Sequence, residues 1–267
     1  MLKQRVVTAL VLFVLSLLAL FGADSLTWQL VVVAIVFIAA WEWSQFAKIQ
    51  HKGMRVIYAG LTALILGFAL QVDWQSWMLY LALLQLLIVV YAVTRFQLSA
   101  GKRVLQQREF NLAIGVLFMV SFGLALIGLR EAFSAWLLLF SMLMIWVMDS
   151  GAYFAGRRFG RHKLAPYVSP GKTWEGVIGG VLFSMVVALV LWFSWQPDYQ
   201  PGLLFFVVFT SLIAALSVYG DLFESLMKRQ VGLKDSGKIL PGHGGVLDRI
   251  DSLLLALPLF WVFWSFG

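Results

Sequence analysis

The densest group of chemically capable side chains lies near the carboxyl end, between residues 220 and 252. Five acids and five cations balance there, which a simple excess of basic residues in membrane loops would not produce. If a helix continues past Tyr219, then Asp221, Ser225 and Lys228 share one face, because they are spaced at i, i+4 and i+7. That face would present a carboxylate, a hydroxyl and an ammonium group together.

A second pair of carboxylates follows a glycine-rich turn. Asp248 and Asp251 share a face with Ser252 at the start of the last apolar segment, so two helix ends would present carboxylates toward each other. Because the chain has no Cys and only three His, these oxygen donors suit a hard cation such as Mg²⁺, which commonly binds phosphates as well. The pattern favours phosphoryl or nucleotidyl transfer at a membrane surface, with a structural network of salt bridges as the alternative.

A third polar segment, between residues 149 and 176, has features that suit phosphate binding. Glycine lets backbone approach a ligand closely, and the Arg and Lys residues of this segment can pair with phosphate oxygens. A Gly-Lys-Thr triplet resembles the end of a P-loop, but Pro166 stands where that motif requires glycine and no strand precedes it. We therefore reject a P-loop. The usual excess of cations in cytoplasmic loops explains the basic residues, but it does not explain Asp149, Ser169 or Glu175.

The composition indicates a membrane protein. Apolar residues make up 61% of the 267 residues and charged residues only 12%, against about 25% in an average soluble domain. An ordinary soluble domain and a disordered chain are both excluded. The net charge of +7 would suggest nucleic acid in a soluble protein, but with this apolar excess we expect a membrane and no nucleic-acid partner. The absence of Cys excludes disulfides and thiol catalysis.

Nine apolar segments approach the roughly 20 residues that a membrane-spanning helix needs. They are Val6–Phe21, Leu26–Trp41, Met54–Leu70, Trp77–Val93, Asn111–Leu129, Ala132–Met148, Gly176–Trp195, Leu203–Tyr219 and Ser252–Phe266. The expected fold is an all-α, polytopic integral membrane protein, with residues 1–130 as N-terminal membrane helices without a motif and residues 131–267 as the catalytic region. Gly176 and Gly180 are expected to pack closely against another helix, and such a small-residue face also permits a homodimer.

The distribution of cations predicts the orientation of these helices. With nine spans, nineteen of the twenty Lys and Arg residues fall on one side of the membrane and only Arg130 on the other. Since short basic loops remain in the cytoplasm, we expect a cytoplasmic N-terminus, a C-terminus on the opposite side, and an active site that faces the cytoplasm. The expected location is a bacterial plasma or inner membrane.

The polar segments resemble the signature of phosphatidate cytidylyltransferases, the CDP-diacylglycerol synthases. The matching residues of the later segment are Ser225, Lys228, Arg229, Lys234, Asp235, His243, Gly244, Gly245, Asp248, Arg249 and Asp251. The earlier segment is similar to the family at residues 149–153 and 169–176, although Gly171 stands where family members often have Lys. The spacing of so many fixed polar residues is too specific to arise by chance.

The resemblance implies that CTP and phosphatidate react to give CDP-diacylglycerol and pyrophosphate. It also implies that Asp221 and Asp248 hold Mg²⁺ and act in catalysis, and that Asp251 completes a cation site that can include K⁺. Lys228 and Arg229 are the implied catalytic cations. The implied substrate-binding residues are Ser169, Lys172, Ser225, Lys234, His243 and Arg249. A structural or phosphate-contacting role is expected for His243, because phosphatidate is already a nucleophile near neutral pH and a general base is unnecessary.

Three alternatives to this function remain open. A CTP-dependent, polyprenol-type lipid kinase and an archaeal-type CDP-lipid synthase would use related chemistry on other lipids. A membrane transporter would also have many spans and ionisable groups, but no inverted repeat is visible and the polar groups gather on one side. Membrane lipid surrounds the protein in every case.

Overall fold

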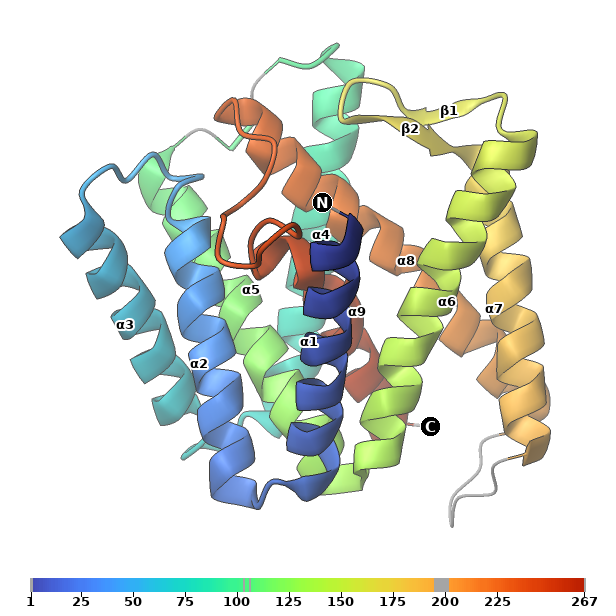
Figure 1. Cartoon of the computed structure of the whole chain (residues 1–267), viewed down its shortest axis with the longest axis horizontal. Helices are drawn as coiled ribbons and strands as arrows, with labels where there is room; N and C mark the ends of the chain where they lie inside the picture. The colour runs from blue at the N-terminus through green and yellow to red at the C-terminus, as the bar shows by residue number, and fades with distance from the viewer. Residues whose placement is uncertain (1, 103, 106, 195–201, 267) are drawn as a thin grey trace.

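The computed structural model describes residues 2–102, 104–105, 107–194 and 202–266. Within these residues the chain forms nine α-helices, a short π-helical turn and one β-hairpin (Figure 1). The helical elements are α1 (Leu2–Gly22), α2 (Ser25–Trp43), α3 (Lys52–Ala69), α4 (Gln75–Leu98), α5 (Arg108–Gly128), η1 (Leu129–Phe133), α6 (Ala135–Phe159), α7 (Trp174–Ser194), α8 (Leu203–Gln230) and α9 (Leu247–Phe266). The antiparallel hairpin consists of β1 (Lys163–Ala165) and β2 (Ser169–Thr173).

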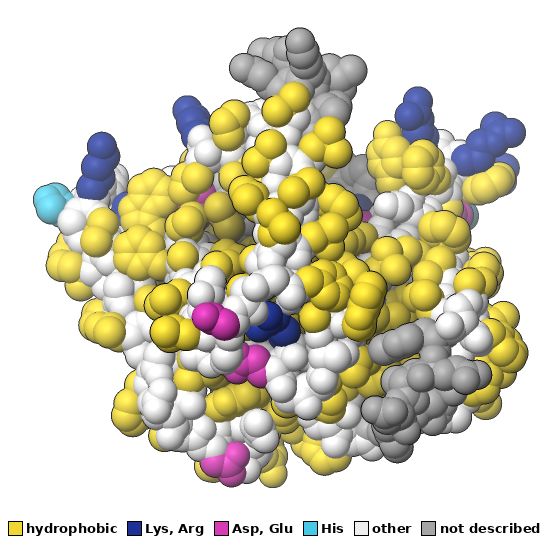
Figure 2. Space-filling model, turned by 60° about the horizontal axis from the view of Figure 1, so that its bottom comes forward, with side chains coloured by type: hydrophobic (Ala, Val, Ile, Leu, Met, Phe, Trp, Pro, Cys, Tyr) yellow, Lys and Arg dark blue, Asp and Glu magenta, His cyan; other side chains and the backbone are white. Residues whose placement is uncertain are grey.

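Eight of the described helices are long and apolar enough to cross a membrane. α1 adds a shorter apolar stretch, Val7–Gly22, so the described residues contain eight candidate spans where the sequence predicts nine. Many large apolar side chains are exposed on the outside of the bundle, as Leu64, Phe68 and Leu87 illustrate, and Figure 2 shows such side chains over much of one face. A soluble protein does not expose apolar surface on this scale. The predicted helical, polytopic membrane architecture is confirmed.

The connections between helices alternate between the two ends of the molecule. The connections that carry most of the Lys and Arg residues, namely α2–α3, α4–α5, α6–α7 and α8–α9, lie at the end that is uppermost in Figure 1, here called the basic end. α9 ends at the opposite end. Figure 2 shows several Lys and Arg side chains that project along its upper rim. Arg130 lies at the other end, where it donates hydrogen bonds to the carbonyl oxygens of Leu20, at 2.7 Å, and Ala23. This arrangement agrees with the predicted split of the cations, and the cytoplasmic location of the basic end stays a prediction.

α5 and α9 form the buried centre of the bundle. Every residue of α5 from Phe118 onward is buried, and so is most of α9 between Ser252 and Trp264. Phe118 stacks on Phe223 of α8, with ring centroids 5.2 Å apart, and on Trp43 of α2 at 6.0 Å. Aromatic side chains bury large apolar areas, so this cluster holds α2, α5 and α8 together.

α6 and α7 pack with their backbones close together, and glycines make the approach possible. A β-carbon at Gly180 would lie 2.7 Å from the carbonyl oxygen of Met148, and one at Gly176 would lie 2.8 Å from that of Ala152. The predicted close packing at both glycines is confirmed. Because α6 of the same chain covers this face, a homodimer would have to use another surface.

Two elements differ from the expectation drawn from the sequence. The sixth span is expected to end at Met148, whereas α6 remains helical to Phe159, which puts Asp149 inside the helix. The hairpin is also unexpected, because its strands are too short and too polar to show the alternation that marks a strand. In contrast, α8 does run past Tyr219, to Gln230, as the predicted polar face requires.

We expect Gly180→Ala to destabilise the protein, because the added methyl group would lie 2.7 Å from both the carbonyl oxygen and the sulfur of Met148. Overpacking of this kind costs about 1–3 kcal/mol. The measurement is the melting temperature of the purified protein in detergent. Gly67→Ala in α3 is the matched control, since a β-carbon there meets nothing within 4 Å. Equal melting temperatures for the two variants would contradict the close packing of α6 and α7.

Candidate active site

A cavity of about 580 Å³ lies where α6, β2, α7, α8 and α9 meet. Its charged lining residues are Asp149, Arg157, Lys172, Asp221, Asp248, Arg249 and Asp251. Acids and cations from both polar segments of the sequence are therefore gathered in one volume, although the segments are far apart along the chain. We refer to it as the first cavity.

The strand β2 brings Lys172 into the first cavity. The Lys172 ammonium group lies 2.6 Å from Asp221 Oδ2 and 3.4 Å from the carbonyl oxygen of Val218, both on α8. Ser169, at the other end of β2, lines the same cavity. The structure thus places both of these predicted substrate-binding residues at the site, with Lys172 paired to one of the predicted metal ligands.

Glu175 fastens the base of the hairpin to α7. Its carboxylate accepts hydrogen bonds from the backbone N–H groups of Arg161, at 3.1 Å, and His162, at 3.2 Å, and also lies 2.6 Å from His162 Nδ1. Thr173 Oγ1 caps α7 by accepting a backbone N–H three residues further on, at 3.2 Å. These contacts fix β2 relative to α7, and with it the position of Lys172.

One face of α8 carries Asp221, Ser225 and Lys228, as the helical spacing predicts. Ser225 Oγ donates a hydrogen bond to Asp221 Oδ1 at 3.3 Å. The Lys228 ammonium group lies 2.8 Å from Asp248 Oδ1 on α9 and also pairs with Glu224, whose side chain is only 1% exposed. Lys228 therefore acts as the counter-ion of two acids, of which Glu224 has no place in the predicted site.

Asp248 is held by three donors. Besides Lys228, it accepts hydrogen bonds from the backbone N–H groups of Ser236, at 2.9 Å, and Gly245, at 2.8 Å. As the second residue of α9 it also lies at a helix N-terminus, where the helix dipole favours a negative charge. Asp248 thus joins α8 and α9 to the loop between them, residues 231–246, called the α8–α9 loop below.

Asp149 and Asp251 complete the acidic lining. Asp149 Oδ2 accepts a hydrogen bond from Ser252 Oγ at 3.3 Å, which joins α6 to α9. Asp149 lies close enough to Lys172 and Asp221 to interact with them electrostatically, and Asp251 interacts with Asp221 in the same way. The predicted site residues include Asp251 but not Asp149. Asp149 follows directly after an apolar run, and an ionisable residue at such a place is costly and usually functional. This position is the signal that could have identified Asp149 as a site residue.

Most of the remaining predicted residues lie outside the first cavity. Lys234 and His243 line a second cavity, of about 600 Å³, which is built from the α8–α9 loop and the start of α9. Arg249 lines both cavities and so lies between them. Arg229 is exposed, and neither Arg229 nor Ser225 belongs to the lining of the two cavities. The predicted substrate-binding residues are therefore not gathered in one place: two line only the first cavity, two line only the second, Arg249 lines both and Ser225 lines neither.

The donor types fit a hard divalent cation, but their arrangement is not that of a formed metal site. Asp221, Asp248 and Asp251 all line the first cavity, and Mg²⁺ prefers carboxylate oxygen. Among the described residues, no group of three or more acidic, His or Cys side chains is arranged to hold an ion. Ammonium groups stand beside two of the acids instead, Lys172 at Asp221 and Lys228 at Asp248. The predicted metal ligands stay a prediction.

Comparison with known protein families matches residues 3–266 to the cytidylyltransferase family. The chain belongs to this family. The phosphatidate cytidylyltransferase of Pseudomonas aeruginosa is 38% identical over 97% of this chain and 96% of the relative. The phosphatidate cytidylyltransferase of Haemophilus influenzae is 36% identical over 100% of this chain and 99% of the relative. The enzyme of that name from Staphylococcus saprophyticus is 35% identical over 96% of this chain and 96% of the relative. The resemblance seen in the polar residues is confirmed, and the similarity extends through the N-terminal helices.

We expect Lys228→Met to lower stability strongly, because it leaves the buried carboxylates of Glu224 and Asp248 without their cation. Removal of one partner from a buried ion pair costs about 3–5 kcal/mol. The measurement is again the melting temperature in detergent. The neighbouring Arg229→Met is the matched control, because Arg229 is exposed and its removal should leave the melting temperature unchanged. If both variants melt like the unaltered protein, Lys228 does not serve as this counter-ion.

Proposed function

We propose that this protein transfers the cytidylyl group of CTP to phosphatidate and so produces CDP-diacylglycerol and pyrophosphate. The observation that carries the proposal is the match of nearly the whole chain to relatives named phosphatidate cytidylyltransferase. A cavity that gathers acids and cations within a bundle of membrane helices suits this reaction, because one substrate is water-soluble and the other is a lipid. The protein is then a nucleotidyltransferase of phospholipid biosynthesis.

The reaction is a displacement at phosphorus. An oxygen of the phosphatidate phosphate attacks the α-phosphorus of CTP, the bond to the oxygen that bridges to the β-phosphorus breaks, and pyrophosphate leaves with that electron pair. The attacking oxygen already carries negative charge near neutral pH, so no general base is required. Since the two substrates are polyanions that repel each other, the main tasks of the protein are positioning and charge neutralisation.

In this proposal Asp221, Asp248 and Asp251 hold Mg²⁺, with K⁺ as a second cation. The metal would supply charge neutralisation on the phosphates of CTP. Lys172 is the cation best placed for a substrate phosphate, because β2 holds it in the first cavity. Asp221, which pairs with Lys172 in this structure, would then exchange the ammonium group for the metal.

We also assign each of the two cavities to one of the two substrates. The first is bordered by α6 and α7, whose Tyr153 and Val177 belong to its lining, and we assign it to the phosphatidate headgroup. The second contains Lys234 and His243 of the α8–α9 loop, and we assign it to the nucleotide. Arg249, which lines both, is assigned to the phosphates that meet between them.

We further propose that the basic end of the molecule faces the cytoplasm. The excess of Lys and Arg in its connections supports this orientation. It gives the second cavity, which is built from one of these connections, access to cytoplasmic nucleotide. The bacterial origin of the relatives supports a plasma or inner membrane location.

The first test of the function is pyrophosphate release by the purified, detergent-solubilised protein supplied with CTP, phosphatidate and Mg²⁺. We expect release that requires both substrates. We expect Asp248→Asn, which keeps the shape of the side chain but removes its charge, to lower the rate by about 10²-fold or more.

The lipid supplied decides between the alternatives. Formation of CDP instead of pyrophosphate with a polyprenol would indicate a lipid kinase, and activity only with an ether-linked lipid would indicate an archaeal-type synthase. No turnover with any of these lipids, from protein shown to bind CTP, would refute the enzymatic proposal and favour a transporter.

A metal titration tests the assigned ligands. We expect EDTA to abolish pyrophosphate release and added Mg²⁺ to restore it. Asp221→Asn should raise the Mg²⁺ concentration for half-maximal activity by at least about tenfold, because a neutral amide is a weaker ligand than a carboxylate. Asp73→Asn is the control, since Asp73 lies in the connection between α3 and α4, away from both cavities. Equal Mg²⁺ requirements for the two variants would rule out Asp221 as a ligand.

A further inference from the structure

Glu42, in the last turn of α2, is a buried carboxylate outside the polar segments of the sequence. The residue is 0% exposed. Its Oε2 accepts a hydrogen bond at 2.8 Å from the backbone N–H of Leu247, the first residue of α9, and another at 3.3 Å from Ser236 Oγ in the α8–α9 loop. A side chain near the N-terminus of the protein therefore caps the helix that carries Asp248.

The α8–α9 loop wraps closely around this carboxylate. A β-carbon at Gly237 would collide with Glu42 Oε1, and one at Gly245 would lie 2.5 Å from Glu42 Oε2. Any other residue at either position would force the loop and the acid apart. The two glycines thus serve the close approach of the loop to Glu42.

Glu42 and Asp248 hold the same part of the loop. Ser236 donates its N–H to Asp248 and its hydroxyl to Glu42, and its carbonyl oxygen accepts a hydrogen bond from Gln45 Nε2 at 2.7 Å. Gly245 donates its N–H to Asp248, and its α-carbon lies so close to Glu42 that a side chain would not fit there. Displacement of Glu42 would therefore move both backbone groups that orient Asp248.

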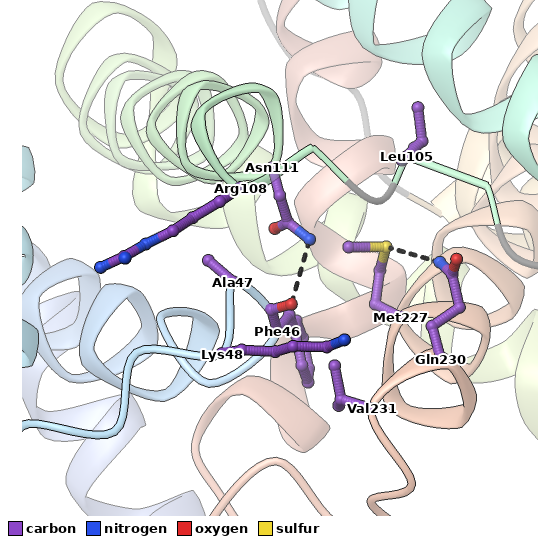
Figure 3. Close-up of a pocket in the computed structure, with 9 residues that line it drawn as sticks. All are labelled: Phe46, Ala47, Lys48, Leu105, Arg108, Asn111, Met227, Gln230 and Val231. Atoms are coloured by element: carbon purple, nitrogen blue, oxygen red, sulfur yellow. Dashed lines mark hydrogen bonds between the residues drawn. The ribbon is translucent and has the colours of Figure 1, made fainter.

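The end of α2 is itself fixed against α5. Trp43 Nε1 donates a hydrogen bond to Asn111 Oδ1 at 3.1 Å. Asn111 Nδ2 donates in turn to the carbonyl oxygen of Phe46 at 3.2 Å, and Figure 3 shows this side chain reaching from α5 to the turn that follows α2. These hydrogen bonds to Asn111 of α5 hold the end of α2, and therefore Glu42, in a fixed position beside the loop.

The Glu42 carboxylate is only partly compensated at this place, by the Leu247 and Ser236 donors and by its electrostatic interaction with Arg55. Glu42 Oε1 is buried and has no hydrogen-bond partner among the described residues. Burial of an incompletely paired carboxylate costs free energy, whereas an apolar contact would join α2 to α9 without that cost. The acid is better explained by the backbone groups that its oxygens position.

We propose that Glu42 is a positioning residue of the active site. It fixes the α8–α9 loop so that Ser236 and Gly245 orient Asp248, and so that Arg249 stays between the two cavities. Glu42 acts through the loop and does not touch the substrates. The kinetic part of the inference rests on the proposed function.

The kinetic test compares Glu42→Ala with the conservative Glu42→Gln. We expect Glu42→Ala to lower kcat by about 10²-fold and to raise the Mg²⁺ concentration for half-maximal activity. Glu42→Gln keeps an oxygen that can accept the Leu247 N–H, so it should recover most of the activity. Gln85→Ala is the control, because Gln85 is a buried polar residue of α4 outside both cavities. It is expected to lower the melting temperature and to leave kcat and the Mg²⁺ requirement unchanged.

Hydrogen exchange of residues 231–247 gives a readout that does not depend on turnover. We expect faster exchange there in Glu42→Ala than in Gln85→Ala or in the unaltered protein. If the unaltered protein released no pyrophosphate, the proposed function would fail, and the exchange rates would still show whether Glu42 holds the loop. The inference is overturned if exchange in the loop does not change, or if the loop loosens while kcat and the Mg²⁺ requirement stay the same.

Discussion

The arrangement of the site depends on how one buried charge, the Asp248 carboxylate, is satisfied. Its partners are the Lys228 ammonium group of α8 and two backbone N–H groups of the α8–α9 loop. A carboxylate that lost these donors without water to replace them would cost several kcal/mol. The same Lys228 ammonium group also forms an ion pair with the buried carboxylate of Glu224. These shared requirements restrict α8, the loop and α9 to one arrangement, and the first cavity lies beside it.

α6 and α7 form the opposite wall of the first cavity, and their close packing is a steric constraint on its shape. Glycines let the backbones of α6 and α7 approach closely, and a β-carbon at Gly151 would lie only 3.1 Å from the α-carbon of Gly180. The hairpin between these helices is held over α8, where Lys172 meets Asp221. Hydrogen bonding of Ser252 to Asp149 joins this wall to α9. The charges are therefore carried by elements whose positions packing has already set, as electrostatic preorganisation requires.

The membrane setting explains the pairing of charges within the site. Acids that lie in or beside spanning helices are far more costly than acids in water, so a nearby cation or several N–H donors stabilise them strongly. Lys172 and Lys228 meet this need with ammonium groups, which bind phosphate oxygens as readily as carboxylates. A site built in this way is suited to an exchange of partners when anionic substrates arrive. Glu42 contributes rigidity to the same site from the N-terminal helices.

Hydrophobicity, helical period and charge placement are local properties of the chain. They were sufficient to predict the membrane class, most of the helices, the common side of the cations and the shared face of Asp221, Ser225 and Lys228. They did not reveal the hairpin, the helical environment of Asp149 or the contact between Glu42 and Leu247, which are 205 residues apart. Which lysine neutralises which acid, and which of the predicted residues line a cavity, became clear from the three-dimensional arrangement. Both depend on the packing of α6 to α9 against one another and against α2, which no local pattern records.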